Sequence, residues 1–325
     1  MQKLTRRNLL QAGAAGLAAS AVVAAGAAGG APAAAQGAPA AAKEDKPVKD
    51  RWRISMNVAT IRPAGVEEKI RACAAAGYDC IELWQNDLDG WERGGKPLED
   101  LAKRIKDAGM EYTNVIGFGT SMPQSDADRP KAIEDVKRRC AQAAKAGAKH
   151  ISVIPTPDRP DIDLLWAAHR YREILDAAKD TGVVPSIEFL GFNKGVHTLG
   201  QAALIAIEAD RPEASIVADT FHMYRGGSSF RGVCQTSAAL YAILHVNDAP
   251  KTPGQFQVAD NDRLYPGDGI LPLAQLLKDL WKIGFRGPLS LEIFRNEEYR
   301  KPAEEVAKTG IEKIRKVIAA SGTEN

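Results

Sequence analysis

The sequence predicts an α/β fold of the (β/α)8 TIM-barrel class. Three observations support this prediction. Amphipathic stretches that end in glycine alternate with short β-rich runs, these runs are almost continuously apolar, and eight such units fit into residues 51–325. Continuously apolar strands are typical of a parallel sheet whose faces are both covered. We therefore expect one catalytic barrel domain over 51–325.

The eight strands can be placed in chain order. They are expected at 53–58, 79–84, 111–116, 149–154, 184–189, 215–219, 242–247 and 288–293, with helices between them and a last helix at 304–320. Five glycines follow helical stretches where a helix needs a left-handed C-cap: Gly77, Gly109, Gly147, Gly182 and Gly284. The first strand is not followed by a glycine-rich dinucleotide fingerprint, so a Rossmann domain is not expected.

The first fifty residues are expected to lie outside the barrel. Arg6 and Arg7 precede a weakly apolar Ala/Gly run, and Ala33-Ala34-Ala35 offers a small-residue cleavage site. This pattern resembles a twin-arginine signal peptide over 1–35, followed by a flexible linker over 36–50. The run has too few Leu, Ile and Phe residues for a stable membrane span. The resemblance implies export of the folded protein by the twin-arginine machinery to the periplasm or the medium; an alanine-rich tail is the alternative.

Composition excludes one class of partner. The chain has 43 basic and 41 acidic residues and a formal charge of +2. Without a basic stripe carrying interleaved aromatic residues, we expect no nucleic-acid partner.

Polar side chains stand at the predicted C-terminal ends of four consecutive strands: Glu188, Asp219, His245 and Glu292. The C-terminal ends of barrel strands converge on one rim, so these side chains should share a small space. Carboxylates and an imidazole are suitable ligands for a divalent metal. Without a cation, three carboxylates this close would repel one another. The sequence therefore predicts a metal site.

Each of these residues also has an ordinary structural interpretation. Asp219 can cap the following helix, and His245 can be a hydrogen-bonded core histidine. Glu292 can pair with Arg295 or another rim arginine, and Glu188 can face solvent. The metal site is favoured because the ordinary interpretations require four independent coincidences at the same end of adjacent strands.

Three further residues are expected to bind substrate. Glu82 and Trp84 end the second predicted strand and can wall the pocket, since a flat aromatic ring suits the face of a sugar. Ordinary rim packing is the alternative. Arg263 is expected to contact substrate oxygens, with a surface ion pair as its alternative.

The stretches SIEFLGF, VADTFHMYRGG, HVNDAP, RLYPGDG and SLEIF resemble the sugar phosphate isomerase/epimerase family of xylose isomerase-like TIM barrels. The resemblance extends from about residue 52 to residue 320. It implies that Glu188, Asp219, His245 and Glu292 bind a divalent metal, manganese first, with magnesium, cobalt or zinc as alternatives. It also implies that His222, in the Asp-x-x-His pattern, contacts a substrate oxygen.

The implied reaction is the isomerisation or epimerisation of a sugar or keto-sugar. Removing a proton from a carbon beside a carbonyl creates an enediolate, whose negative charge a metal stabilises. Glu188 and Glu292 approach from different strands, so one can abstract the proton and the other return it. His222 can supply or accept a further proton.

Two other functions remain open. A metal-dependent lyase, dehydratase or hydrolase acting on an oxidised sugar or a glycoside would use the same residues, and a non-catalytic sugar-binding barrel would keep the pocket without turnover. Related three-zinc DNA-repair endonucleases have Asp-Arg-His where this chain has Asp262-Arg263-Leu264, so DNA cleavage is not expected. The oligomeric state is left unpredicted.

Overall fold

A computed structural model describes residues 51–118, 122–123 and 125–323. The predicted signal peptide (1–35) and linker (36–50) lie outside the described residues, so both stay predictions. Within the described part of the chain, no helix is both long enough and apolar enough to cross a bilayer.

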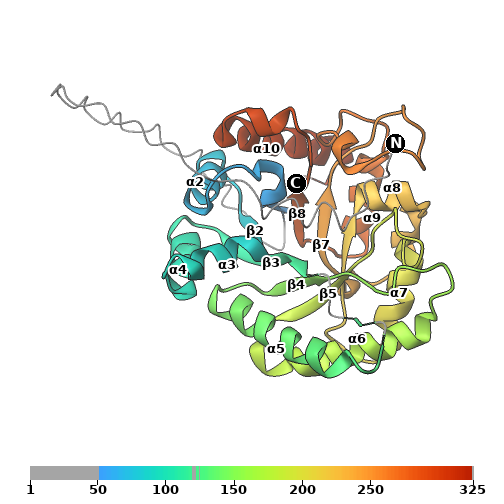
Figure 1. Cartoon of the computed structure of the whole chain (residues 1–325). Helices are drawn as coiled ribbons and strands as arrows, with labels where there is room; N and C mark the ends of the chain where they lie inside the picture. The colour runs from blue at the N-terminus through green and yellow to red at the C-terminus, as the bar shows by residue number, and fades with distance from the viewer. Residues whose placement is uncertain (1–50, 119–121, 124, 324–325) are drawn as a thin grey trace, which may run out of the picture. The chain divides into compact units, whose positions relative to one another are not determined.

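Eight parallel strands form a closed barrel in chain order, with the last strand hydrogen-bonded to the first (Figure 1). The strands are β1 (Arg53–Asn57), β2 (Cys80–Trp84), β3 (Glu111–Phe118), β4 (His150–Val153), β5 (Val184–Glu188), β6 (Ile216–Asp219), β7 (Tyr241–Val246) and β8 (Pro288–Leu291). The predicted barrel is therefore confirmed. The largest boundary differences are two residues: β3 runs on to Phe118, which still pairs with Val153 of β4, and β8 stops before Glu292.

Helices surround the barrel (Figure 1). The α-helices are α2 (Val66–Ala76), α3 (Gln85–Arg93), α4 (Leu98–Asp107), α5 (Arg129–Lys145), α6 (Leu164–Ala178), α7 (Leu199–Glu208), α8 (Thr220–Gly226), α9 (Leu273–Lys282) and α10 (Ala303–Ser321). Short 3₁₀ helices are η2 (Val58–Ile61), η3 (Lys179–Thr181), η4 (Phe230–Gln235), η5 (Ala238–Leu240), η6 (Asp260–Asp262) and η7 (Glu298–Arg300).

The five predicted helix-ending glycines all adopt the left-handed conformation, with φ between 73 and 92°. Gly77 shows the purpose of this conformation. Its N–H donates to the carbonyls of Cys73 and Ala74, which closes α2 shortly before β2 begins. A residue with a side chain would be strained at this φ, so glycine sets where the helix stops and the strand starts.

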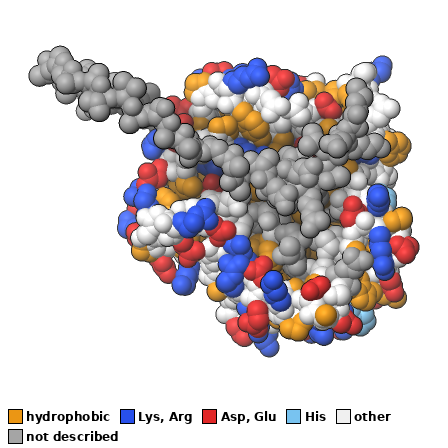
Figure 2. All heavy atoms as spheres, viewed as in Figure 1, with side chains coloured by type: hydrophobic (Ala, Val, Ile, Leu, Met, Phe, Trp, Pro, Cys, Tyr) orange, Lys and Arg blue, Asp and Glu red, His pale blue; other side chains and the backbone are white. Residues whose placement is uncertain are grey.

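The hydrophobic core lies between the outer side of the sheet and the helices. Leu291 of β8 packs against α10 at Gly310, where an added Cβ would lie 2.2 Å from the Leu291 side chain. The missing side chain therefore lets α10 approach the barrel closely. On the face shown in Figure 2, acidic and basic side chains of the described residues are interspersed, in agreement with the balanced composition.

His150 makes the stability of the barrel depend on pH. It begins β4 at the N-terminal end of the barrel, and its Nδ1 lies 3.0 Å from the Ser186 hydroxyl. Burial lowers the pKa of His150 from 6.5 to about 4. Between these values the unfolded chain binds more protons than the folded one, so the free energy of unfolding falls as the pH falls through this window.

Because the pKa of His150 is lowered in the folded state, we expect the free energy of unfolding to be about 2 kcal/mol smaller at pH 5 than at pH 7.5. Urea unfolding at both pH values should show a smaller loss for His150→Gln than for the wild type. The same replacement at the exposed His169 of α6 is the control. An equal loss of unfolding free energy between the two pH values in the wild type and in His150→Gln would contradict the prediction.

Candidate metal centre

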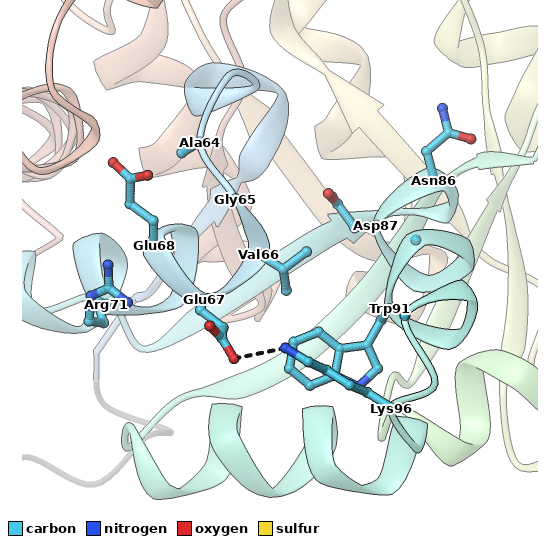
Figure 3. Close-up of a pocket in the computed structure, with 12 residues that line it drawn as sticks. Ala64, Gly65, Val66, Glu67, Glu68, Arg71, Asn86, Asp87, Trp91 and Lys96 are labelled. Atoms are coloured by element: carbon cyan, nitrogen blue, oxygen red, sulfur yellow. Dashed lines mark hydrogen bonds and ion pairs between the residues drawn. The ribbon is translucent and has the colours of Figure 1, made fainter. Parts of the chain in front are cut away.

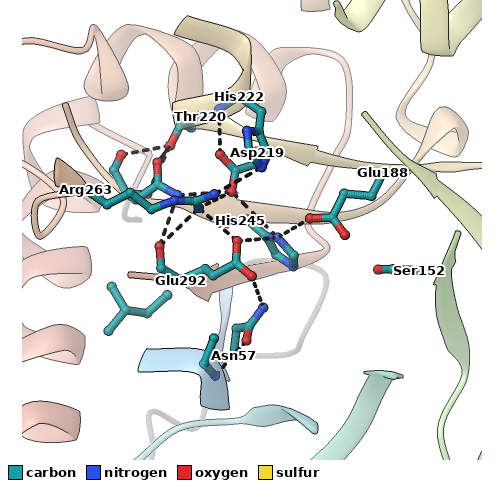
Figure 4. Close-up of polar contacts among 12 residues, drawn as sticks. Asn57, Ser152, Glu188, Asp219, Thr220, His222, His245, Arg263 and Glu292 are labelled. Atoms are coloured by element: carbon teal, nitrogen blue, oxygen red, sulfur yellow. Dashed lines mark hydrogen bonds and ion pairs between the residues drawn. The ribbon is translucent and has the colours of Figure 1, made fainter. Parts of the chain in front are cut away.

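The structure brings the four predicted metal ligands together around one atom, Nδ1 of His245 (Figure 4). This nitrogen lies 3.2 Å from Glu292 Oε2, 3.4 Å from Glu188 Oε1 and 3.8 Å from Asp219 Oδ2. All four residues are buried. Each stands at or just beyond the C-terminal end of its strand, so the barrel itself creates the cluster.

The cluster fits a divalent cation. Nδ1 of His245 is buried and has no hydrogen-bond partner among the described residues, although carboxylate oxygens approach it. Glu188, His245 and Glu292 each offer a ligand atom within 4.8 Å of the others. Ligand atoms bound to one ion at about 2.0–2.2 Å are separated by similar distances. A cation among them would give Nδ1 a partner and offset the charge of the carboxylates.

Asp219 both caps a helix and faces the cluster. Its Oδ1 accepts a hydrogen bond of 2.8 Å from the backbone N–H of His222, which starts α8. Its Oδ2 accepts from Arg263 Nη1 at 2.6 Å and from Asn247 Nδ2 at 3.1 Å. A carboxylate has about four lone-pair positions. Asp219 therefore caps α8, as one of its predicted interpretations stated, and still has lone pairs available for a cation.

Arg263 is buried inside the site, with its side chain 1% exposed. It also forms an ion pair of 3.0 Å with the exposed Asp260, so the alternative of pairing toward the surface holds alongside its contacts inside the site. Its guanidinium lies between the rings of Phe221 and Phe294, 4.8 and 4.9 Å from their centres. Nη1 donates to Asp219 and, at 2.9 Å, to Glu292 Oε2. The described contacts thus direct Arg263 toward the carboxylates, and its contact with substrate stays a prediction.

His222 is held as a neutral imidazole. Its Nε2 lies 3.1 Å from Arg263 Nη2. Because a guanidinium only donates, Nε2 must accept, which places the ring proton on Nδ1. Burial lowers the pKa of His222, which favours this neutral form. Nδ1 is buried and has no hydrogen-bond partner among the described residues, and the contact of His222 with substrate stays a prediction.

The carboxylates of the site differ in proton affinity. Burial raises the pKa of Glu292 to about 7, even though His245 and Arg263 act to lower it. Burial also opposes ionisation of Asp219, but the guanidinium of Arg263 holds the pKa of that carboxyl well below its usual range. In the metal-free protein Asp219 therefore stays ionised, whereas Glu292 can exchange a proton near neutral pH.

The structure places Glu82 behind His245 rather than at the rim. Glu82 is fully buried, and its Oε2 lies 3.2 Å from His245 Nε2, on the opposite side of the imidazole from the three carboxylates. Trp84 is half-buried, and its indole N–H donates to Asn57 Oδ1 at 3.3 Å. The Trp84 ring packs edge-on against Phe294, at 6.3 Å between centres.

The site also contains two asparagines, Asn57 and Asn247, that the sequence patterns did not single out. Asn57 Nδ2 donates to Glu292 Oε1 at 2.6 Å, and Asn247 Nδ2 donates to Asp219 and to the Glu292 carbonyl. Both lie at strand ends of the same rim, and this position is the feature of the sequence that could have identified them. An asparagine at a strand end has many structural uses, so this signal alone is weak.

A hollow of about 490 Å³ lies outside this site, beside α2 and α3 (Figure 3). Lys96 and Glu67 form an ion pair of 3.2 Å across it. None of the predicted site residues lines it, so it is separate from the metal centre.

Comparison with known proteins identifies the family. The model of the xylose isomerase-like TIM barrel family matches residues 70–317, and the chain belongs to this family. The chain is 34% identical to the inosose isomerase of Halalkalibacterium halodurans over 271 residues, which cover 80% of this chain and 94% of that protein. It is 26% identical to the 3-dehydroshikimate dehydratase of Pseudomonas aeruginosa over 247 residues, 75% of this chain and 38% of that protein.

Among solved structures, the chain is similar to a crystal structure of the IolI protein with a bound zinc atom. The TM-score is 0.76 and the identity 25%, over 82% of this chain and 98% of that one. The xylose isomerase-like TIM barrel family, expected from the strand-end motifs, is therefore confirmed. The zinc atom of that structure and the donor set around His245 together support a divalent metal.

The Arg263 guanidinium should stabilise the metal-free protein strongly. Arg263→Leu leaves Asp219 and Glu292 buried without their cation, so we expect the free energy of unfolding to fall by about 3–5 kcal/mol. Urea unfolding in the presence of a chelator measures this. Arg211→Leu is the control, because it removes a more exposed ion pair with Asp176 and should cost at most about 1 kcal/mol. Equal effects of the two substitutions would contradict the assigned role.

Proposed function

We propose that this protein is a metal-dependent isomerase of polyhydroxy ketones of the inosose class, which moves a carbonyl group to the neighbouring carbon by proton transfer. The cluster around His245 Nδ1 carries the proposal, because it combines metal ligands with carboxylates that can move protons. The similarity to an inosose isomerase over nearly that protein's whole length supports this substrate class. The proposed ion is divalent, with zinc and manganese as the first candidates.

A divalent ion bound here would act as a Lewis acid toward the oxygens of the substrate. Glu188 is the proposed base. Among the described residues its only ion-pair contact is His245, so its carboxylate is less engaged than those of Asp219 and Glu292.

Glu292 and His222 have complementary roles. Asn57 and Arg263 fix both oxygens of Glu292, and Glu292 is the proposed group that returns the proton to carbon. The free Nδ1–H of His222 can donate to the substrate oxygen on which negative charge develops.

Epimerisation is the nearest alternative, and it follows if the two glutamates act on opposite faces of the same carbon. Dehydration is the second alternative, and the similarity to a 3-dehydroshikimate dehydratase favours testing it. Proton abstraction is common to all three reactions, and the product distinguishes them.

We expect Glu188→Gln to lower the rate of deuterium uptake into substrate carbon by at least about 100-fold, because the proposed base is removed. The metal-loaded enzyme would be incubated with inososes, keto-sugars and 3-dehydroshikimate in D₂O, with analysis by mass spectrometry. Glu208→Gln, at the exposed end of α7, is the control. Uptake with a shifted carbonyl supports isomerisation, whereas loss of water supports the dehydratase.

The same deuterium-uptake measurement on Glu292→Gln shows whether one glutamate moves the proton in both directions or whether each glutamate moves it in one. If the glutamates act on opposite faces of one carbon, each variant should block exchange from a different epimer. Undiminished exchange in both variants would contradict the assigned roles.

We further propose that the protein is exported by the twin-arginine route, which would present it with free rather than phosphorylated sugars. Joint Arg6→Lys and Arg7→Lys substitution should leave the protein uncleaved in the cytoplasm. Cell fractionation with mass measurement of the mature chain tests this. Unchanged export of the double variant would contradict the proposal.

A further inference from the structure

We propose that Glu82 is a positioning residue: its carboxylate fixes the His245 imidazole so that the Nδ1 lone pair faces the metal position. This inference rests on the metal dependence of the proposed function. Glu82 acts through His245 and itself lies on the far side of the ring from the other carboxylates.

The contact between these residues crosses the inside of the barrel. Glu82 belongs to β2 and His245 to β7, which are not neighbours in the closed sheet. Their side chains can therefore meet only through the interior. Both are fully buried, and Oε2 of Glu82 lies 3.2 Å from Nε2 of His245. Both groups are shielded from bulk solvent, so this contact determines what Nε2 can do.

The carboxylate of Glu82 is itself held in place. Asn114 of β3 donates through Nδ2 to Glu82 Oε2 at 2.7 Å. The same Nδ2 also donates to the Ser152 hydroxyl of β4 at 2.9 Å. Three consecutive strands thus fix one oxygen beneath the imidazole. Glu82 does not need to reach the rim to affect the metal centre.

This arrangement determines the imidazole tautomer. An ionised carboxylate only accepts hydrogen bonds, so in the neutral imidazole that binds a metal the single ring proton is drawn to Nε2. Nδ1 then carries the lone pair, and it is the atom surrounded by Glu188, Asp219 and Glu292 without a hydrogen-bond partner among the described residues. A metal-bound histidine whose second nitrogen donates to a carboxylate is oriented and made more basic.

The expected effect is on metal affinity, which can be measured without knowing the substrate. Loss of such a partner costs about 10–100-fold in metal affinity. We therefore expect Glu82→Ala to bind Zn²⁺ and Co²⁺ about 10–100-fold more weakly than the wild type, by competition with a chromophoric chelator. Glu82→Gln keeps an oxygen acceptor, so it should recover most of the loss.

The control is Asp279→Ala, which also removes a buried acid: Asp279 lies on α9 and pairs with Arg231 of η4. It should leave metal affinity unchanged. Circular dichroism and thermal unfolding of the metal-free variants would show that each is folded. Wild-type affinity in folded Glu82→Ala would overturn the proposal.

A second measurement needs no variant. In the Co²⁺-loaded wild type, a histidine bound through Nδ1 and hydrogen-bonded to Glu82 should give a paramagnetically shifted Nε2–H resonance that disappears in D₂O. Coordination through Nε2 would overturn the proposal even if Glu82→Ala fails to fold.

The two proposals can fail separately. A wild type that binds metal as described but converts no polyhydroxy ketone would remove the proposed function and leave the role of Glu82 intact. A wild type that binds no divalent metal would overturn the role of Glu82.

Discussion

Buried negative charge around one imidazole is the constraint on which the rest of the site depends. Glu188, Asp219 and Glu292 face one nitrogen of His245, and Glu82 faces the other. Burying an ion costs several kcal/mol unless opposite charge lies close by. Arg263 compensates part of this charge through its contacts with Asp219 and Glu292. Burial disfavours a charged His245, but Glu292 and Glu82 raise its pKa well above the ordinary value, so the imidazole also carries positive charge in the metal-free protein. The remaining imbalance is what makes a divalent cation a fitting occupant, and a rigid barrel is needed to hold the groups together when it is absent.

The position of Arg263 gives the carboxylates unequal properties. Phe221 and Phe294 cover its guanidinium and exclude water, so its charge acts through a medium of low polarity. Asp219, which receives the shorter hydrogen bond, is kept ionised, while Glu292 has a pKa of about 7. In the metal-free protein a permanent anion and a proton-exchanging acid therefore share one buried cluster.

The sequence predicted the barrel, the rim and the four clustered residues because each depends on a local pattern. Apolar runs between glycine-ended helices define strands, and polar residues at strand ends define the rim. The partner of Glu82 was not predictable in this way, since His245 is 163 residues away and the contact depends on side-chain depth inside the barrel. The burial of Arg263 was equally hidden, because Phe221 and Phe294 come from separate segments. Local patterns thus identified residues at the rim, but they did not show how deeply each side chain is buried in the barrel.

The spacing of Asp219 and His222 has a simple mechanical origin. A residue that caps a helix bonds the backbone N–H three positions later, so the cap and His222 are fixed relative to each other by the first turn of α8. Arg263 then joins the two side chains, with Nη1 on Asp219 and Nη2 on His222. The capping carboxylate of Asp219, the guanidinium of Arg263 and the imidazole of His222 are therefore joined into one buried unit. Because the unit consists of side chains fixed by the start of a helix, its geometry is set by the fold before any ligand binds.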